Sequence, residues 1–250
     1  MKILILSTFG NYGGAATCAK RLYNSLKKDG LDVELRAVQF YDNNLIKSVL
    51  PDTFLNRIIS KFYFIIERLQ VLYNIKKIKH LYKFSTGSVG LKLSNFPIVK
   101  EADIIHLHWI NFGLVSIAEI AELANKKCLI WTQHDMWSFT GGCHYAMQCE
   151  RYKNVCDDCF YLRNSALSES VQDSKISNWK PQAFKVIATS NWLAQCTQNS
   201  TVFRGWNVEV LPTPIDVSIF KPLNKQELRK KYTLEEEDFY ILFVAVDIKD

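Results

Sequence analysis

The chain has 250 residues, of which 48% are hydrophobic and 22% charged, and 31 Lys and Arg against 25 Asp and Glu give a formal net charge of +6. This is ordinary globular composition, long enough for one large domain or for one and a half small ones. No uncharged apolar run reaches the roughly eighteen residues of a transmembrane helix. Glu67 and Arg68 interrupt the most apolar stretch, 62–73, so the sequence excludes a membrane-spanning segment.

The N-terminal sequence MKILILSTFG predicts a buried strand rather than a signal peptide. A single lysine precedes a short apolar run, with neither a long hydrophobic region nor a cleavage site of small residues. We therefore expect a cytoplasmic protein, whose seven cysteines form no disulfides in that reducing environment.

The first predicted elements form a strand–turn–helix–strand unit. Residues 2–9 are an apolar run typical of a strand buried on both faces, and residues 10–14 (GNYGG) form a tight turn. Apolar residues then recur every three or four positions over 15–28, which predicts a helix, and 32–40 is a second strand. Such a βαβ unit is typical of a parallel sheet.

The middle of the chain continues to alternate between strands and helices. Residues 45–84 have helical character, with apolar and aromatic side chains interleaved with bases. The further predicted elements are strands at 102–109, 127–133, 184–189 and 208–211 and helices at 114–125 and from about residue 190. This alternation predicts an α/β fold with a Rossmann-like, doubly wound parallel sheet.

Prolines mark the predicted domain boundary. Residues 1–212 form the α/β domain, and 213–238 form a linker with a charged helix at 223–231. Residues 239–250 begin with the apolar run FYILFVAV, which reads as a buried strand. Because such a strand needs neighbours on both sides, we expect it to open a second domain that the sequence does not complete.

Glycines and histidines follow predicted strands, and ligands of open α/β sheets bind at the carboxyl ends of the strands. Gly13 and Gly14 follow the first strand, where they either let backbone N–H groups approach an anion or serve as a structural turn. Their spacing does not fit the dinucleotide fingerprint. His106 and His108 are two residues apart in a later strand, so both point to one face of the sheet. We expect them to be hydrogen-bonded there rather than to bind a metal ion.

His134 and Asp135 follow the next predicted strand. A histidine can donate a hydrogen bond or act as a general base, whereas a carboxylate only accepts. A substrate contact and a loop-capping pair both fit this placement.

Four cysteines lie within seventeen positions and include one C-x-x-C pair. They are Cys143, Cys149, Cys156 and Cys159. Four thiolates can close a tetrahedral zinc site, and the long polar loop 138–162 needs something to order it. We therefore predict a structural zinc ion, with His144 as a substitute ligand and four ordinary buried thiols as the alternative. A closed site leaves no position for substrate, so no catalytic role is expected.

The segment 45–84 carries the whole excess of positive charge, since its eight basic and two acidic residues give +6. With its aromatic residues it is suited to an anionic membrane surface. We favour that partner over nucleic acid, because no nucleic-acid-binding fold is recognised. A solvated helix face that covers the sheet is the alternative.

Several of these stretches together resemble family 4 glycosyltransferases, most closely bacterial members that build surface polysaccharides. They are the opening KILILSTFGNYGGAA, the strand ADIIHLHW, the stretch TQHDMWSFTGGCHY with the cysteines after it, the SNW after a strand, and the linker LPTPIDVSIFKP. The resemblance runs from residue 1 to about residue 250.

The resemblance implies a GT-B fold, in which two Rossmann-like domains face a cleft, and a retaining sugar transfer without a catalytic metal. It implies that Gly13 and Gly14 lie close to the donor diphosphate and that His134 hydrogen-bonds the donor sugar in the catalytic site, with Asp135 beside it. Most donor contacts are implied to lie in a C-terminal half that this chain lacks. We therefore expect the fragment alone to be nearly inactive.

The predicted function is the acceptor-side part of a glycosyltransferase of surface polysaccharide synthesis. It would transfer a sugar from a nucleotide sugar to a saccharide or lipid-linked saccharide, in the cytoplasm or on the inner membrane face. The alternative is a non-catalytic, zinc-stapled α/β module that binds a membrane or a partner. A dinucleotide-dependent oxidoreductase is disfavoured, because the second predicted strand ends without the acidic residue that would bind the ribose.

Overall fold

The structure is a computed structural model that describes residues 1–39, 46–50 and 54–243. The chain divides into two compact units, Met1–Pro214 and Ile215–Asp250, which are described separately. All seven strands of the described residues lie in the first unit.

The first unit is built on one sheet of seven parallel strands in the order β3-β2-β1-β4-β5-β6-β7. The strands are β1 (Lys2–Phe9), β2 (Asp32–Gln39), β3 (Lys47–Ser48), β4 (Ile104–Leu107), β5 (Cys128–Gln133), β6 (Lys185–Ala188) and β7 (Val208–Val210). β1 stands between β2 and β4, so the chain builds the sheet outward from β1 in two directions.

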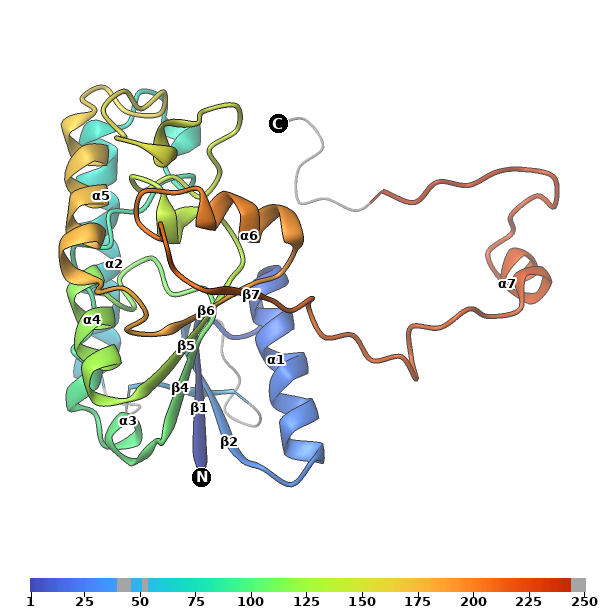
Figure 1. Cartoon of the computed structure of the whole chain (residues 1–250). Helices are drawn as coiled ribbons and strands as arrows, with labels where there is room; N and C mark the ends of the chain where they lie inside the picture. The colour runs from blue at the N-terminus through green and yellow to red at the C-terminus, as the bar shows by residue number, and fades with distance from the viewer. Residues whose placement is uncertain (40–45, 51–53, 244–250) are drawn as a thin grey trace. The chain divides into compact units, whose positions relative to one another are not determined.

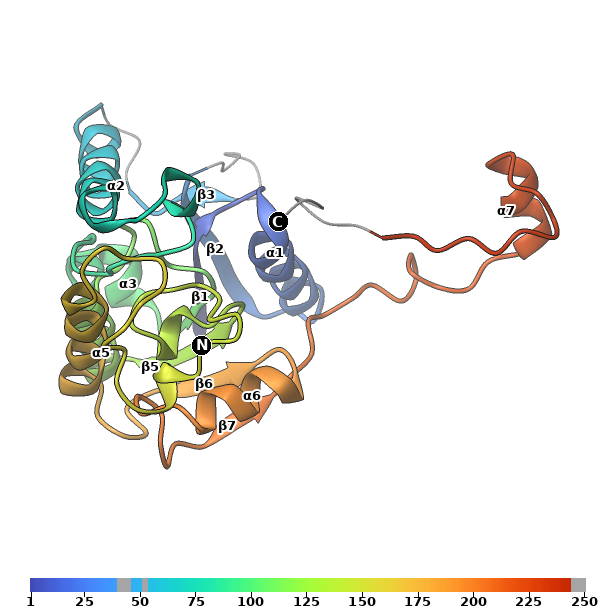
Figure 2. The same cartoon turned by 90° about the horizontal axis from the view of Figure 1, so that it is seen from above.

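Helices cover both faces of this sheet, with α2 to α5 on one side and α1 and α6 on the other (Figures 1 and 2). They are α1 (Gly13–Lys28), α2 (Phe54–Asn74), α3 (Pro97–Glu101), α4 (Ile117–Lys126), α5 (Ala166–Asn178) and α6 (Asn191–Gln198). The described residues also include 3₁₀ helices at Ile78–His80, Leu93–Asn95, Trp137–Phe139 and Arg151–Lys153. This architecture confirms the predicted α/β fold with a Rossmann-like, doubly wound parallel sheet.

None of the helices in the described ranges is both long enough and apolar enough to cross a bilayer.

Strand β1 supplies both hydrophobic cores of the first unit. Leu4 and Leu6 pack in the larger core, while Ile3 and Ile5 pack in a smaller core with Ala19 of α1. Alternate residues of a strand point to opposite faces, so the continuous apolar run at the N-terminus follows from burial on both sides.

Among the strands and α-helices described in the first unit, β3, α3 and α5 were not predicted. The strand β3 has two residues and α3 has five, which is too short for a periodic signal. Helix α5 lacks an apolar stripe because its buried face includes Ser168, Gln172 and Lys175. In the described part of the segment 45–84, which leaves out residues 45 and 51–53, the α-helix covers 54–74 and a short 3₁₀ helix follows at 78–80.

The helix α2 ends where its chain meets another segment. Ile75 forms an antiparallel bridge with Leu162, and the N–H of Lys76 donates to the carbonyl of Tyr161 at 2.8 Å. The backbone groups of residues 75 and 76 thus pair with the segment at 161–162. The helix does not need to continue in order to satisfy them.

Two buried residues of α2 with ionisable side chains contact the segment that follows the helix, at 81–87. Glu67 is fully buried and Arg68 nearly so, and the guanidinium lies 3.4 Å from the carboxylate. Arg68 donates to the carbonyls of Leu81 at 2.6 Å and Phe84 at 3.0 Å. Arg68 therefore serves the interior and does not add to the basic surface predicted for this segment.

The second unit has one helix among its described residues, α7 (Lys225–Lys231), capped by the Asn224 side chain. Residues 239–243, where the last strand was predicted, pair with no strand, and 244–250 lie outside the described residues. The strand is absent from the described part of that run, where no neighbour pairs with its backbone groups. That the run opens a second domain stays a prediction.

Gly113 brings α2 close to the loop after β4. Its φ is +83°, and a Cβ there would lie 2.7 Å from the carbonyl carbon of Tyr63 and 2.8 Å from the nitrogen of Phe64. Gly205 has a similar φ of +81°, but a Cβ there would meet nothing within 4 Å. The two glycines thus share the backbone conformation and differ in the steric contact.

We predict that Gly113→Ala lowers the free energy of unfolding by about 2 kcal/mol more than Gly205→Ala does. Both variants carry the cost of a left-handed alanine, and only the first adds a backbone clash. Urea denaturation of the two variants measures the difference. Equal losses would mean that α2 can move away from the loop without cost.

Candidate functional site

The strand order reverses between β1 and β4, which are neighbours in the sheet although they are far apart in the chain. In open α/β sheets the ligand crevice lies outside the carboxyl ends of the strands at such a switch point. The backbone closes this edge tightly, since the N–H of Thr8 donates to the carbonyl of Trp109 at 2.7 Å. The loops after β1, β4 and β5 therefore meet at the place where a ligand is expected.

The glycine turn after β1 leaves open space at this edge. Gly13 has a φ of +85°, which glycine adopts without strain, and α1 begins with it. Neither Gly13 nor Gly14 has an atom within 4 Å of where a Cβ would lie, and the N-cap residue Tyr12 makes no side-chain cap. The start of a sixteen-residue helix is thus free of a side-chain cap and can receive an anion.

Three histidine rings form a row across the ends of β4 and β5. The rings of His106 and His108 have centroids 4.7 Å apart, and those of His108 and His134 are 5.1 Å apart. His106 Nε2 hydrogen-bonds Thr132 Oγ1 at 2.8 Å, and His108 Nδ1 hydrogen-bonds His134 Nε2 at 2.9 Å. The prediction that His106 and His108 share a face and are hydrogen-bonded is confirmed.

Burial keeps these rings neutral. It lowers the pKa of His106 and of His134 to about 4 and the pKa of His108 well below its ordinary value. At neutral pH His134 therefore presents a neutral ring, which offers one N–H donor and one acceptor nitrogen. Its Nε2 faces His108, so Nδ1 is the nitrogen that His108 does not engage.

Cys18 lies between the glycine turn and the row of histidines. It lies on α1, one helical turn after Gly14, and its sulfur and a ring nitrogen from each of His108 and His134 all lie within 4.8 Å of one another. Of the residues that the structure describes, these three are the one group of that kind that is close enough to hold a metal ion. This contact was not predicted, because the position of Cys18 four residues after Gly14 does not tell which loop the cysteine faces.

The Asp135 carboxylate is engaged by three donors. Oδ2 accepts from Trp109 Nε1 at 2.7 Å and pairs with His144 Nδ1 at 2.6 Å, and Oδ1 accepts from the N–H of Trp137 at 2.9 Å. Burial acts to raise its pKa, but His144 and the N–H donors outweigh burial and lower it. Both oxygens are used within the protein, which favours a positioning role for Asp135 over direct contact with a substrate.

His144 is not available as a zinc ligand. Its Nδ1 pairs with Asp135, and its Nε2 hydrogen-bonds Ser85 Oγ at 2.9 Å. With both ring nitrogens engaged, the expectation that His144 could replace a cysteine is wrong.

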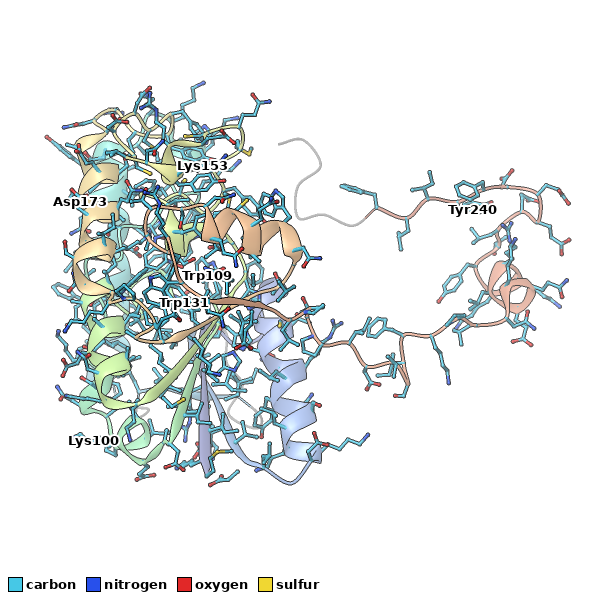
Figure 3. All side chains as sticks on the ribbon, viewed as in Figure 1. Lys100, Trp109, Trp131, Lys153, Asp173 and Tyr240 are labelled. Atoms are coloured by element: carbon cyan, nitrogen blue, oxygen red, sulfur yellow. The ribbon has the colours of Figure 1, made fainter. Side chains whose placement is uncertain are left out.

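Aromatic rings wall the site on the side of β1 and β4. Trp109 stacks on Phe9 with centroids 5.2 Å apart and on His144 at 5.4 Å, and it meets Phe112 edge-on at 4.7 Å. Figure 3 places Trp109 and Trp131 inside the first unit, with Lys100 at the opposite end of the sheet. Trp109 was not predicted as a site residue, and His144 was predicted only as a substitute zinc ligand, not as a partner of Asp135.

The four clustered cysteines lie apart from the switch point, in the loop between β5 and α5. Cys143, Cys149, Cys156 and Cys159 together line one cavity of about 20 Å³. All are free thiols, and all but Cys149 are buried. Burial raises the pKa of Cys156 to about 11 and raises those of Cys143 and Cys159, so these three are neutral thiols without a metal.

We predict that the chain loses stability as the pH falls from about 6.5 to about 4. The unfolded chain binds protons on His106 and His134 below about pH 6.5, whereas the folded chain does so only near pH 4. The stabilisation is therefore complete above the unfolded pKa and is lost on acidification, by up to about 3 kcal/mol for each ring.

The measurement is the free energy of unfolding across this pH range for the wild type and for His106→Gln. Carboxylates also titrate here, so the difference between the two chains isolates the histidine. The variant should lose about 1.4 kcal/mol less per pH unit in this window. Parallel pH profiles would contradict the assignment of a neutral buried His106.

The family model described as Glycosyltransferase Family 4 matches residues 12–219. A stretch of 88 residues is 35% identical to WcaC of Escherichia coli (strain K12), which is named as a colanic acid biosynthesis glycosyl transferase. That match covers 34% of this chain and 20% of WcaC, so the chain spans only a small part of this relative.

The family match includes Gly13 and Gly14, the histidine row and the cysteine loop, and it extends over most of the chain. The chain therefore belongs to Glycosyltransferase Family 4.

Proposed function

We propose that the first unit is the acceptor-side domain of a retaining GT-B glycosyltransferase. The complete protein would transfer a sugar from a nucleotide sugar to a saccharide or lipid-linked saccharide, without a catalytic metal. The observation that supports this proposal is that α1, which begins at Gly13 and Gly14, carries Cys18, whose sulfur lies within 4.8 Å of a ring nitrogen of His134 at the switch point. The colanic acid relative favours a role in surface polysaccharide synthesis.

The glycine turn suits the charged part of a donor. Negative charge develops on the leaving diphosphate during glycosyl transfer, and backbone N–H groups at a helix N-terminus stabilise such charge. Open space at Gly13 and Gly14 lets phosphate oxygens approach the start of α1. The turn would therefore bind the diphosphate through backbone groups rather than side chains.

The neutral ring of His134 suits the sugar part of the donor. A neutral imidazole donates or accepts a hydrogen bond with a hydroxyl and adds no positive charge beside the reacting carbon. The His108 contact fixes the ring plane of His134, and Asp135 holds the loop on which it stands. We assign sugar contact to His134 and a positioning role to Asp135.

The activity belongs to the complete protein in this proposal. The aligned stretch is 20% of WcaC, and the described residues of the second unit form no sheet. A second Rossmann-like domain would supply most contacts to the nucleotide, so unit 1 alone would turn over little or no donor.

We predict that Gly14→Ala lowers donor turnover at least tenfold in the protein made from the complete reading frame. The added methyl meets no protein atom, and alanine is the better helix former, so the stability should stay the same or rise by up to about 1 kcal/mol. A loss of turnover would thus indicate that the added methyl group blocks the diphosphate at the turn. His134→Gln should lower turnover as well, through the sugar.

The assay first screens common nucleotide sugars for consumption and then compares the variants on the donor that is used. Lys27→Ala, at the other end of α1, is the matched control and should leave turnover unchanged. If no donor is consumed, the glycosyltransferase proposal fails. If Gly14→Ala turns over donor normally, the placement of the diphosphate at the turn fails.

We propose further that one face of α2 rests on an anionic membrane and so meets a lipid-linked acceptor. Five apolar side chains at helical spacing are exposed by 42% to 57%. They are Ile58, Phe62, Ile65, Leu69 and Leu72. Exposed lysines flank them on the helix and just after it, at 61, 76, 77 and 79. An apolar stripe beside lysines fits the boundary between anionic headgroups and acyl chains.

We predict that the chain binds phosphatidylglycerol vesicles and that Phe62→Ser with Leu69→Ser weakens binding at least tenfold. Each exposed side chain that enters the membrane contributes about 1.5–3 kcal/mol when fully buried, and binding should weaken with salt. Sedimentation with vesicles measures the partition. Trp192→Ser on α6, in the opposite helix layer, is the control.

Equal binding to phosphatidylcholine vesicles would refute the role of the lysines. Unchanged binding of the double variant would refute the role of the α2 face.

A further inference from the structure

The loop between β5 and α5 folds with little regular secondary structure. Between Gln133 and Ala166 it contains two 3₁₀ turns and otherwise irregular chain. A loop of this length in a compact domain needs an ordering element of its own. All four of its cysteines line one cavity, together with other residues of the loop that include Arg151, Asp158 and Phe160.

The cavity that these cysteines share has the size of one small ion. Its volume is about 20 Å³, and one water-sized sphere needs roughly 10–15 Å³. Its lining also includes Gly141 and Ser168, and a Cβ at Gly141 would lie 2.6 Å from Cβ of Cys156. The chain therefore packs tightly beside a space that the four sulfur-bearing residues leave between them.

Backbone N–H groups already point at two of the sulfurs. The N–H of Gly141 donates to Cys156 Sγ at 3.2 Å, and the N–H groups of Tyr161 and Leu162 hydrogen-bond Cys159. Donors of this kind orient metal-bound ligands and stabilise their negative charge. A buried neutral thiol needs them less, because it is only a weak acceptor.

The backbones of the same two cysteines are held by side chains. The N–H of Cys156 donates to Gln172 Oε1, and that of Cys159 donates to Ser165 Oγ, both at 2.7 Å. Gln172 and Ser168 lie on the buried polar face of α5. This face therefore fixes the loop in the position that brings the cysteines together.

A buried lysine stands beside the cluster. Lys175 is fully buried and donates to the carbonyl oxygens of Trp137 and Thr140, and its charge acts on Cys143 and Cys156. Zinc with four thiolates has a net charge of −2, which is costly to bury without compensation. Burial lowers the pKa of Lys175 to about 7, whereas the charges of Cys156 and Cys143 act to raise it, so thiolates there would favour the protonated amine that offsets part of that charge.

We propose that Cys143, Cys149, Cys156 and Cys159 bind one structural zinc ion through four thiolates. The four thiol protons go to solvent, and four Zn–S bonds form. Around the ion the sulfurs would lie roughly 3.8 Å apart, from a Zn–S distance of about 2.3 Å. They are farther apart in this structure, since no three of them form a group within 4.8 Å, so binding draws them in around the cavity.

The group of Cys18, His108 and His134 is the competing location for a metal. There the nearest nitrogens of the two histidines are already hydrogen-bonded to each other. A metal at this group would have to break that bond, whereas the cysteine cluster has N–H donors and a lysine arranged for thiolates. The two sites differ in ligands, and this difference makes the proposal testable.

The experiment measures metal content and thiolate ligation in the full chain. Zinc per chain is determined by mass spectrometry for the wild type and for Cys156→Ser with Cys159→Ser. Cys128→Ser, an exposed cysteine outside the cluster, and Cys18→Ser are the controls. Cobalt is then exchanged into the wild type, where the sulfur-to-cobalt charge-transfer band counts the thiolates.

We expect one zinc ion per chain in the wild type and in both controls and none in the double variant. The cobalt band should have the intensity of four thiolates, and a chelator should lower the melting temperature of the wild type. Because the cobalt spectrum uses the wild type, a double variant that fails to fold does not affect it.

Three results would overturn the proposal. The first is a wild type that takes up neither zinc nor cobalt. The second is a cobalt spectrum with one thiolate and nitrogen ligands, which would place the metal at Cys18. The third is full zinc content in a folded double variant.

Discussion

The carboxylate of Asp135 fixes the edge of the sheet on which the candidate site stands. It accepts from Trp109, which follows β4, and from the backbone of Trp137, which follows β5, and it pairs with His144. A buried carboxylate without these partners would be strongly destabilising, so the two loops stay together as long as the domain is folded. His134, the neighbour of Asp135 in the chain, is held in place by its hydrogen bond to His108.

Two buried basic side chains, Arg68 and Lys175, extend this polar interior away from the sheet. Arg68 and Lys175 donate to backbone carbonyls of irregular segments, and each lies against an aromatic ring, that of Phe112 at 4.3 Å and that of Trp137 at 4.0 Å. Long irregular loops carry many carbonyl groups that need donors. These side chains supply donors, which explains why α2 and α5 bury basic groups on faces that would otherwise be apolar.

The proposed donor site and the proposed zinc site lie in different parts of the domain and have different tasks. The switch point carries an open glycine turn and a neutral histidine, which suit a donor with an anionic and a hydroxylated part. The cysteine loop is linked to Asp135 by Trp137, whose N–H donates to the carboxylate and whose carbonyl accepts from Lys175. It has no open glycine turn. Zinc binding there would stabilise the loop that positions His134 and would take no part in the transfer.

Much of the fold follows from the sequence alone. The apolar run of β1 is buried on both faces, the glycine turn is followed by α1, and His134 comes directly after β5, because strand and helix periodicities are local properties of the chain. Helix α5 was not predicted because its buried face carries polar side chains. Gln172 and Lys175 are buried there because they hydrogen-bond the backbone of the loop before the helix. Only the folded structure decided that Cys18 meets the histidine row, that Asp135 is saturated by donors and that Arg68 is interior. Those contacts join segments far apart in the chain, and no local pattern of residues encodes them.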